Sequence, residues 1–83
     1  MARLKIEKQP CTNALDTMKI TGFTDGELSE LKSMEHHESK DKLLDMLDYR
    51  NGGIGTQWMC GYGVFAHWFD NDAAYVHIGK SCD

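Results

Sequence analysis

Residues 58–78 carry the feature that most limits the folds open to this chain. From Trp58 to Phe69 the side chains alternate with a period of two, and the acidic sequence DND follows at positions 70–72. The segment AAYVHI at 73–78 then continues with strand-like composition. Such alternation on both sides of an Asp- and Asn-rich turn is typical of two antiparallel strands. We therefore predict a long β-hairpin.

The length of the turn decides which residues share a face of this hairpin. A three-residue turn at 70–72 places the even-numbered residues of both strands on one face, which we predict to be the core face. That face comprises Val64, Ala66, Trp68, Ala74, Val76 and Ile78. The opposite face comprises Phe65, His67, Phe69, Tyr75 and His77. We interpret this second group either as covered by another element or as an aromatic binding surface.

Two longer helices are predicted before the hairpin. Thr24 and Glu27 form the sequence signature of a capping box, and Phe23 and Leu28 occupy the two positions of a hydrophobic staple. A helix therefore begins at Thr24. A second helix is predicted over residues 39–50, because an Asn-Gly-Gly sequence that favours helix termination follows it.

The N-terminal part of the chain predicts two shorter elements. RLKI at 3–6 is typical of a short strand, whereas Thr12 as an N-cap, with Leu15 and Met18 at near-helical spacing, indicates a short helix. An isolated hairpin is marginally stable, so helices must cover one of its faces. The predicted fold class is α+β, with two or three short helices packed on a small twisted antiparallel sheet built around the C-terminal hairpin. A chain of 83 residues is expected to form a single domain, 1–83.

Negative charge is concentrated in the middle of the chain. The whole chain has a formal net charge of −4, whereas residues 25–48 alone carry −5. Four of these acids fall on one side of the second predicted helix: Glu38, Asp41, Asp45 and Asp48. Because a basic segment is missing here, direct nucleic-acid binding is disfavoured. We interpret the acidic row either as a solvated helix face or as a surface for a partner with a basic surface.

The segment CGYGVFAHW at 60–68 partly resembles the strand with which RNA-recognition domains stack bases. Val64 stands where a stacking ring belongs, and Phe65 stands where an aliphatic residue belongs. One alternative hypothesis is therefore a single-stranded nucleic-acid binder that uses Phe65, Phe69 and Tyr75.

Cysteine and histidine residues near the hairpin raise the question of a metal site. Cys60 and His67 would lie ~23 Å apart on an extended strand and on opposite faces, so they cannot share an ion. The three-residue turn places Cys60 opposite Cys82, which suggests a metal-binding or thiol-redox pair as a further alternative. The same two thiols also fit the role of small buried hydrophobic groups. No cofactor is predicted, and no recognisable catalytic constellation is present, which predicts a protein that is not an enzyme.

Length, charge and motifs together indicate a protein-binding module. No apolar run reaches the ~18 residues of a membrane span, and the first residues lack a secretory signal, so a cytoplasmic location is expected. In size, acidity and lack of a catalytic motif, the chain is similar to the small inhibitors that bacteriophages and mobile elements direct at host defence enzymes, including anti-CRISPR proteins. This similarity is one of general character. It implies inhibition of a host nucleic-acid-binding protein, with the acidic row and the aromatic face as contact surfaces.

Overall fold

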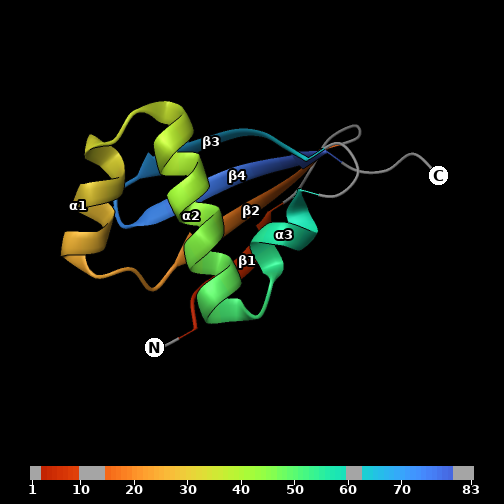
Figure 1. Cartoon of the computed structure of the whole chain (residues 1–83), viewed down its shortest axis with the longest axis horizontal. Coiled ribbons are helices and arrows are strands. Elements are labelled where there is room, and N and C mark those ends of the chain that lie inside the picture. The colour runs from red at the N-terminus through yellow and green to blue at the C-terminus, as the bar shows by residue number, and fades with distance from the viewer. Residues whose placement is uncertain (1–2, 10–14, 60–62, 80–83) are drawn as a thin grey trace.

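The computed structural model describes residues 3–9, 15–59 and 63–79, and it forms an α+β fold (Figure 1). The elements follow in the order β1 (Lys5–Gln9), β2 (Leu15–Thr21), α1 (Asp25–Ser33), α2 (His36–Asn51), α3 (Ile54–Trp58), β3 (Val64–Asp70) and β4 (Ala73–Gly79). The four strands form one antiparallel sheet in the order β1-β2-β4-β3. The three helices lie on the same face of this sheet. The predicted fold class is confirmed.

The N-terminal segment differs from its prediction. Residues 3–6 were expected to contain a strand, and β1 indeed begins at Lys5. The helix expected from Thr12 is wrong, because Leu15–Thr21 forms strand β2 instead. β2 pairs with β1 on one side and with β4 on the other, so its backbone hydrogen bonds are satisfied by the sheet. This tertiary pairing outweighs the local helical spacing.

Helix α1 begins as predicted. The Thr24 side chain accepts a hydrogen bond from the backbone N–H of Glu27, and the Glu27 carboxylate accepts one from the backbone N–H of Thr24 at 2.9 Å. Leu28 and Leu31 are buried, and the helix ends at Ser33 with Met34 as its C-cap. The helix start predicted from the capping box is therefore confirmed.

A short helix that was not predicted lies between the second helix and the hairpin. α2 starts three residues earlier than expected, at His36, and ends at Asn51. Its C-cap is Gly52, whose φ of 74° is in the left-handed region. Gly53 repeats that conformation, and the chain then forms α3 over Ile54–Trp58. The prediction that the hairpin strand begins at Trp58 is therefore wrong, since β3 starts at Val64.

The hairpin itself is present, but its turn has two residues instead of three. Asp70 pairs with Ala73, and Asn71 takes a φ of 53° within the turn. His67 consequently pairs with Val76, and Trp68 pairs with Tyr75. The odd-numbered residues of β3 therefore share a face with the even-numbered residues of β4. A bulge between Val64 and Ala66 then restores the predicted parity at the start of β3.

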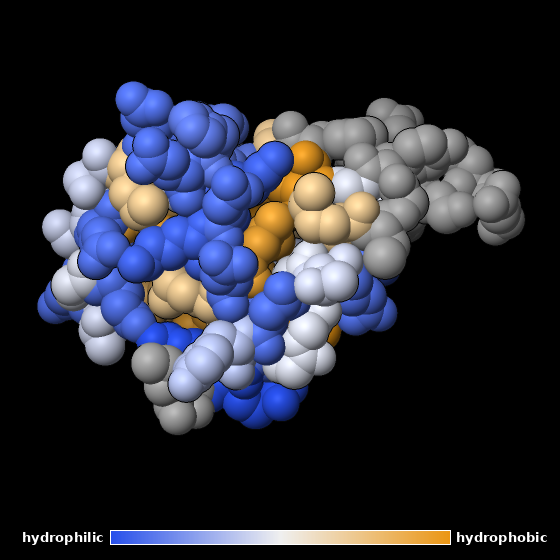
Figure 2. All heavy atoms as spheres, in the orientation of Figure 1, coloured by the Kyte–Doolittle hydropathy of each residue, from blue (hydrophilic) through white to orange (hydrophobic). Residues whose placement is uncertain are grey.

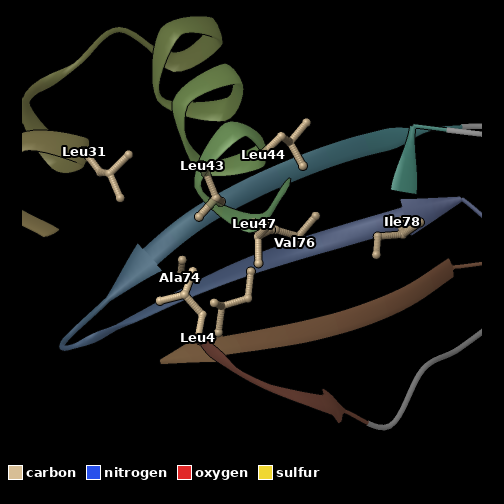
Figure 3. Close-up of a cluster of buried hydrophobic side chains, with 9 residues drawn as sticks. Leu4, Leu31, Leu43, Leu44, Leu47, Ala74, Val76 and Ile78 are labelled. Carbon is tan, nitrogen blue, oxygen red and sulfur yellow. The ribbon is translucent and has the colours of Figure 1, made fainter. Parts of the chain in front are cut away.

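The core lies between the helices and the sheet (Figure 3). Leu31 of α1 and Leu43 and Leu47 of α2 are fully buried, and they meet Ile20 and Val76 from the two central strands. Asn51, at the end of α2, is buried and fixes the segment before β1. Its side chain accepts a hydrogen bond from Leu4 N–H and donates one to Leu4 C=O, both at 3.0 Å. The end of α2 is thus tied to the segment that leads into β1.

Candidate functional site

The acidic residues predicted on α2 divide into two groups. Glu38, Asp41 and Asp45 are exposed, as expected for one side of an amphipathic helix. We call these three residues the acidic surface. The helical side of the molecule is largely hydrophilic, with hydrophobic groups showing between the polar ones (Figure 2). The acidic surface is therefore available to a partner.

Asp48 has a different role from the other three acids. Its carboxylate accepts hydrogen bonds from the Thr56 backbone N–H at 2.7 Å and from the Thr56 hydroxyl at 2.8 Å. These bonds, with a contribution from the backbone N–H of Gly55, lower the pKa of Asp48. Asp48 therefore holds α3 against α2, a structural role that the other three acids do not share.

A groove runs between α2 and α3 beside the acidic surface. It is lined by Asp41, Leu44, Asp45, Asp48, Gly55, Thr56 and Met59. Met59 is 48% exposed, so an apolar side chain lies next to the carboxylates. Gly55 allows α3 to pack closely against α2, because a Cβ at this position would lie 2.2 Å from the Leu44 carbonyl oxygen. No local sequence signal identified Met59 as part of this surface.

In a second groove, between α1 and α2, two of the three lining carboxylates are paired with cations. Arg50 forms an ion pair with Glu27, and Lys42 forms one with Glu30 at 2.6 Å. The hydrogen bond from the Thr24 backbone, followed by that from Arg50, lowers the pKa of Glu27. Because cations of the chain already occupy this groove, it offers less attraction for a basic partner than the groove between α2 and α3.

The residues of the predicted aromatic face do not share one face. Tyr75 and His77 lie on the sheet face away from the helices. His67 and Phe69 face the helices, because the two-residue turn reverses the parity of β3. The prediction that they share an aromatic face with Tyr75 and His77 is therefore wrong, since His67 is buried and Phe69 packs against the core. The side chain of Phe65, the fifth predicted residue, lies outside the described part of the structure.

His67 occupies a buried position between β3 and α2. Its side chain is largely enclosed, with 5% of the residue exposed, and its ring lies 4.2 Å from the His36 ring. Its Nε2 is 2.7 Å from the hydroxyl of Ser39. Burial, and then the nearby positive groups His36 and Lys40, lower the pKa of His67. Ser39 is only 2% exposed, so this Ser–His pair connects two elements and is closed to a substrate.

Three aromatic rings lie together on the outer face of the sheet. Trp68 is the residue of β3 in this group, whereas His67 and Phe69 were predicted there. The Trp68 and Tyr75 rings are stacked, with centroids 5.4 Å apart and planes 3° apart. The Trp68 and His77 rings lie 4.6 Å apart. We call Trp68, Tyr75 and His77 the outer aromatic surface. Trp68, 38% exposed, was assigned to the core because the prediction assumed the wrong turn length. Asn71, a residue that tolerates positive φ, was the available signal for a two-residue turn.

Metal-binding groups are present in one exposed place. Glu35, His37 and Glu38 bring a ligand atom each within 4.8 Å of one another at the start of α2, and all three residues are exposed. Such exposed groups are common on protein surfaces and do not by themselves define a site. The predicted pair Cys60 and Cys82 lies outside the described residues, so that alternative stays a prediction.

Comparison with protein-family models, with curated proteins and with solved structures finds no match for this chain. Within the described residues, none of the helices combines the length and the apolar character needed to cross a membrane.

Proposed function

We propose that this chain is a cytoplasmic, non-enzymatic protein-binding domain that contacts a basic partner through the acidic surface. The observation that carries this proposal is the groove between α2 and α3, where Asp41 and Asp45 lie beside Leu44 and exposed Met59. Carboxylates attract the cations of a basic segment, and the flexible Met side chain adapts to its apolar groups. A basic, partly apolar segment is complementary to such a groove.

The partner class that best fits this surface is a nucleic-acid-binding protein. Glu38, Asp41 and Asp45 are exposed on one side of α2, and a helix rise of ~1.5 Å per residue spaces them by about 4.5 and 6 Å. This spacing is within about a factor of two of the ~3.4 Å axial charge spacing of one DNA strand. The chain would then inhibit its partner by competing with nucleic acid, in the manner of the small inhibitors that phages direct at host defence enzymes.

A defined basic probe tests the proposal. The probe is a short synthetic peptide rich in lysine and arginine, and binding is measured by fluorescence anisotropy at low and at physiological salt. Asp41→Lys combined with Asp45→Lys should weaken binding at least tenfold and reduce its salt dependence, because exposed charges act over a Debye length of ~8 Å at physiological salt. The parent chain should also displace double-stranded DNA from the peptide. Asp48 is left unchanged because it holds α3.

A matched control separates the acidic surface from total charge. Asp70→Lys combined with Asp72→Lys produces the same change in net charge at two exposed residues of the β3–β4 hairpin. This control should retain most of the affinity. Equal loss in both double variants would show that net charge alone governs binding, and equal affinity of parent and Asp41/Asp45 variant would contradict the proposal.

A further inference from the structure

The outer aromatic surface lies on the side of the sheet that the helices do not cover. Figure 1 shows α1, α2 and α3 on the opposite side. Trp68, on edge strand β3, contacts Tyr75 and His77 of the neighbouring strand β4, so the three rings form one continuous surface. Trp68 is exposed, and Tyr75 and His77 are half-buried. Grouped rings that solvent can reach are typical of contact sites, since aromatic side chains provide large, rigid contact areas.

The charges around this surface nearly cancel, with Lys5 and Lys19 against Glu7. By strand register, Glu7 and Lys19 lie in the same row across the sheet as Tyr75. Glu7 also forms an ion pair with Lys5 at 3.0 Å, and both lysines help to lower the pKa of Glu7. A single-stranded nucleic acid needs a groove with several uncompensated cations. Among the described residues, the outer face lacks several uncompensated cations. It therefore suits an uncharged ligand better than a nucleic acid.

The rings also present hydrogen-bond donors. Within the described residues, no acceptor binds the indole N–H of Trp68 or the hydroxyl of Tyr75. His77 Nδ1 lies 2.9 Å from the Thr17 hydroxyl oxygen. When Thr17 donates to Nδ1, the histidine carries its hydrogen on Nε2, which becomes a third donor. An uncharged ligand with free carbonyl groups therefore matches this surface.

We propose that the outer aromatic surface binds a proline-rich peptide segment in the polyproline II conformation. Such a segment has no internal hydrogen bonds, so its carbonyl groups are free to accept from Trp68 and Tyr75, and from His77 when its hydrogen is on Nε2. Its proline rings are apolar and rigid, and they pack on aromatic side chains with little loss of conformational entropy. A helix would already have used its own carbonyl groups, and a β-strand would pair with a sheet edge instead of a sheet face. One polyproline II turn spans about 9 Å, and the centroid of the Trp68 ring lies 5.4 Å from that of Tyr75 and 4.6 Å from that of His77.

Nuclear magnetic resonance of the whole chain tests this inference with a synthetic decapeptide that contains four consecutive prolines. The indole N–H signal of Trp68, assigned through Trp68→Phe, should shift on titration together with signals of Tyr75 and His77. Trp68→Ala should weaken binding at least tenfold, and Trp68→Phe should give an intermediate loss because it keeps a ring but removes the donor. A peptide of the same composition with its prolines separated should bind more weakly.

Tyr49→Ala is the matched control, because Tyr49 is a 78% exposed ring on the helical side of the molecule. This variant should bind the peptide like the parent. Circular dichroism confirms that each variant is folded, and Trp68→Phe keeps the test valid if Trp68→Ala unfolds. Three results would overturn the inference: no shifts at millimolar peptide, tighter binding of a single-stranded oligonucleotide to the same rings, or a dimer in sedimentation that protects them. None of these results bears on the acidic surface, so the two proposals fail independently.

Discussion

Replacing Asn51 by alanine should destabilise this fold more than almost any other single change in a polar residue. The side chain of Asn51 makes two hydrogen bonds to the backbone of Leu4, and both residues are buried. Asn51→Ala removes both bonds and leaves the N–H and the C=O of Leu4 without partners. Each of the two unsatisfied buried groups costs about 1–3 kcal/mol, so the free energy of unfolding should fall by at least about 2 kcal/mol. That loss is a large fraction of the ~5–15 kcal/mol that stabilises a typical domain.

Urea denaturation followed by circular dichroism measures this loss. The midpoint should decrease without a change in the m-value, and the melting temperature should drop by roughly 10–30 °C. Gln57→Ala, which removes an exposed amide from α3, is the control and should stay within about 0.5 kcal/mol of the parent. A loss below about 1 kcal/mol for Asn51→Ala would show that water satisfies Leu4, and it would refute the idea that this bridge fixes the N-terminal segment.

Two further changes test other contacts. Gly55→Ala would place a Cβ 2.2 Å from the backbone oxygen of Leu44, so α3 must move away from α2; we expect a loss of at least about 1–3 kcal/mol in the same assay, and unchanged stability would contradict the close approach. The second concerns His67, whose pKa is lowered by burial and then by nearby positive groups. The unfolded chain therefore binds a proton at higher pH than the folded chain, so stability is complete above about pH 6.5 and decreases as the pH falls, by at most ~1.4 kcal/mol per pH unit. Between pH 7 and 5.5, His67→Gln should flatten this decrease and the exposed-site control His37→Gln should keep it; the same slope in parent and His67→Gln would remove His67 as the cause.

Local signals in the sequence predicted local structure well. The capping box at Thr24 lies within four residues, and its geometry is decided by those residues alone. The acidic surface was predictable for a similar reason, since helical periodicity fixes which side chains share a side of α2. The role of Asp48 was not, because its partner Thr56 belongs to an element that was read as a loop before a strand.

The prediction of the outer aromatic surface depended on the number of residues in the hairpin turn. A two-residue turn and a three-residue turn differ by one position, and one position exchanges the two faces of a strand. His67 was therefore predicted on the outer face and Trp68 in the core, whereas the structure has the reverse. The hairpin itself was predicted correctly. For β2, the decisive contacts come from β1 and β4, and no local pattern in residues 15–21 encodes those neighbours.

The sheet order has a consequence for how the protein is made. β2 is synthesised before the three helices, yet one of its two neighbours is β4, the last strand of the described chain. The contact between Thr17 and His77 spans 60 positions, so the centre of the sheet forms only after β4 has been translated. Because such distant pairings form slowly, one edge of β2 stays unpaired while the helices are synthesised. A ribosome stalled before β4 would therefore hold a chain that lacks a central strand, which makes incomplete products of this protein candidates for rapid degradation.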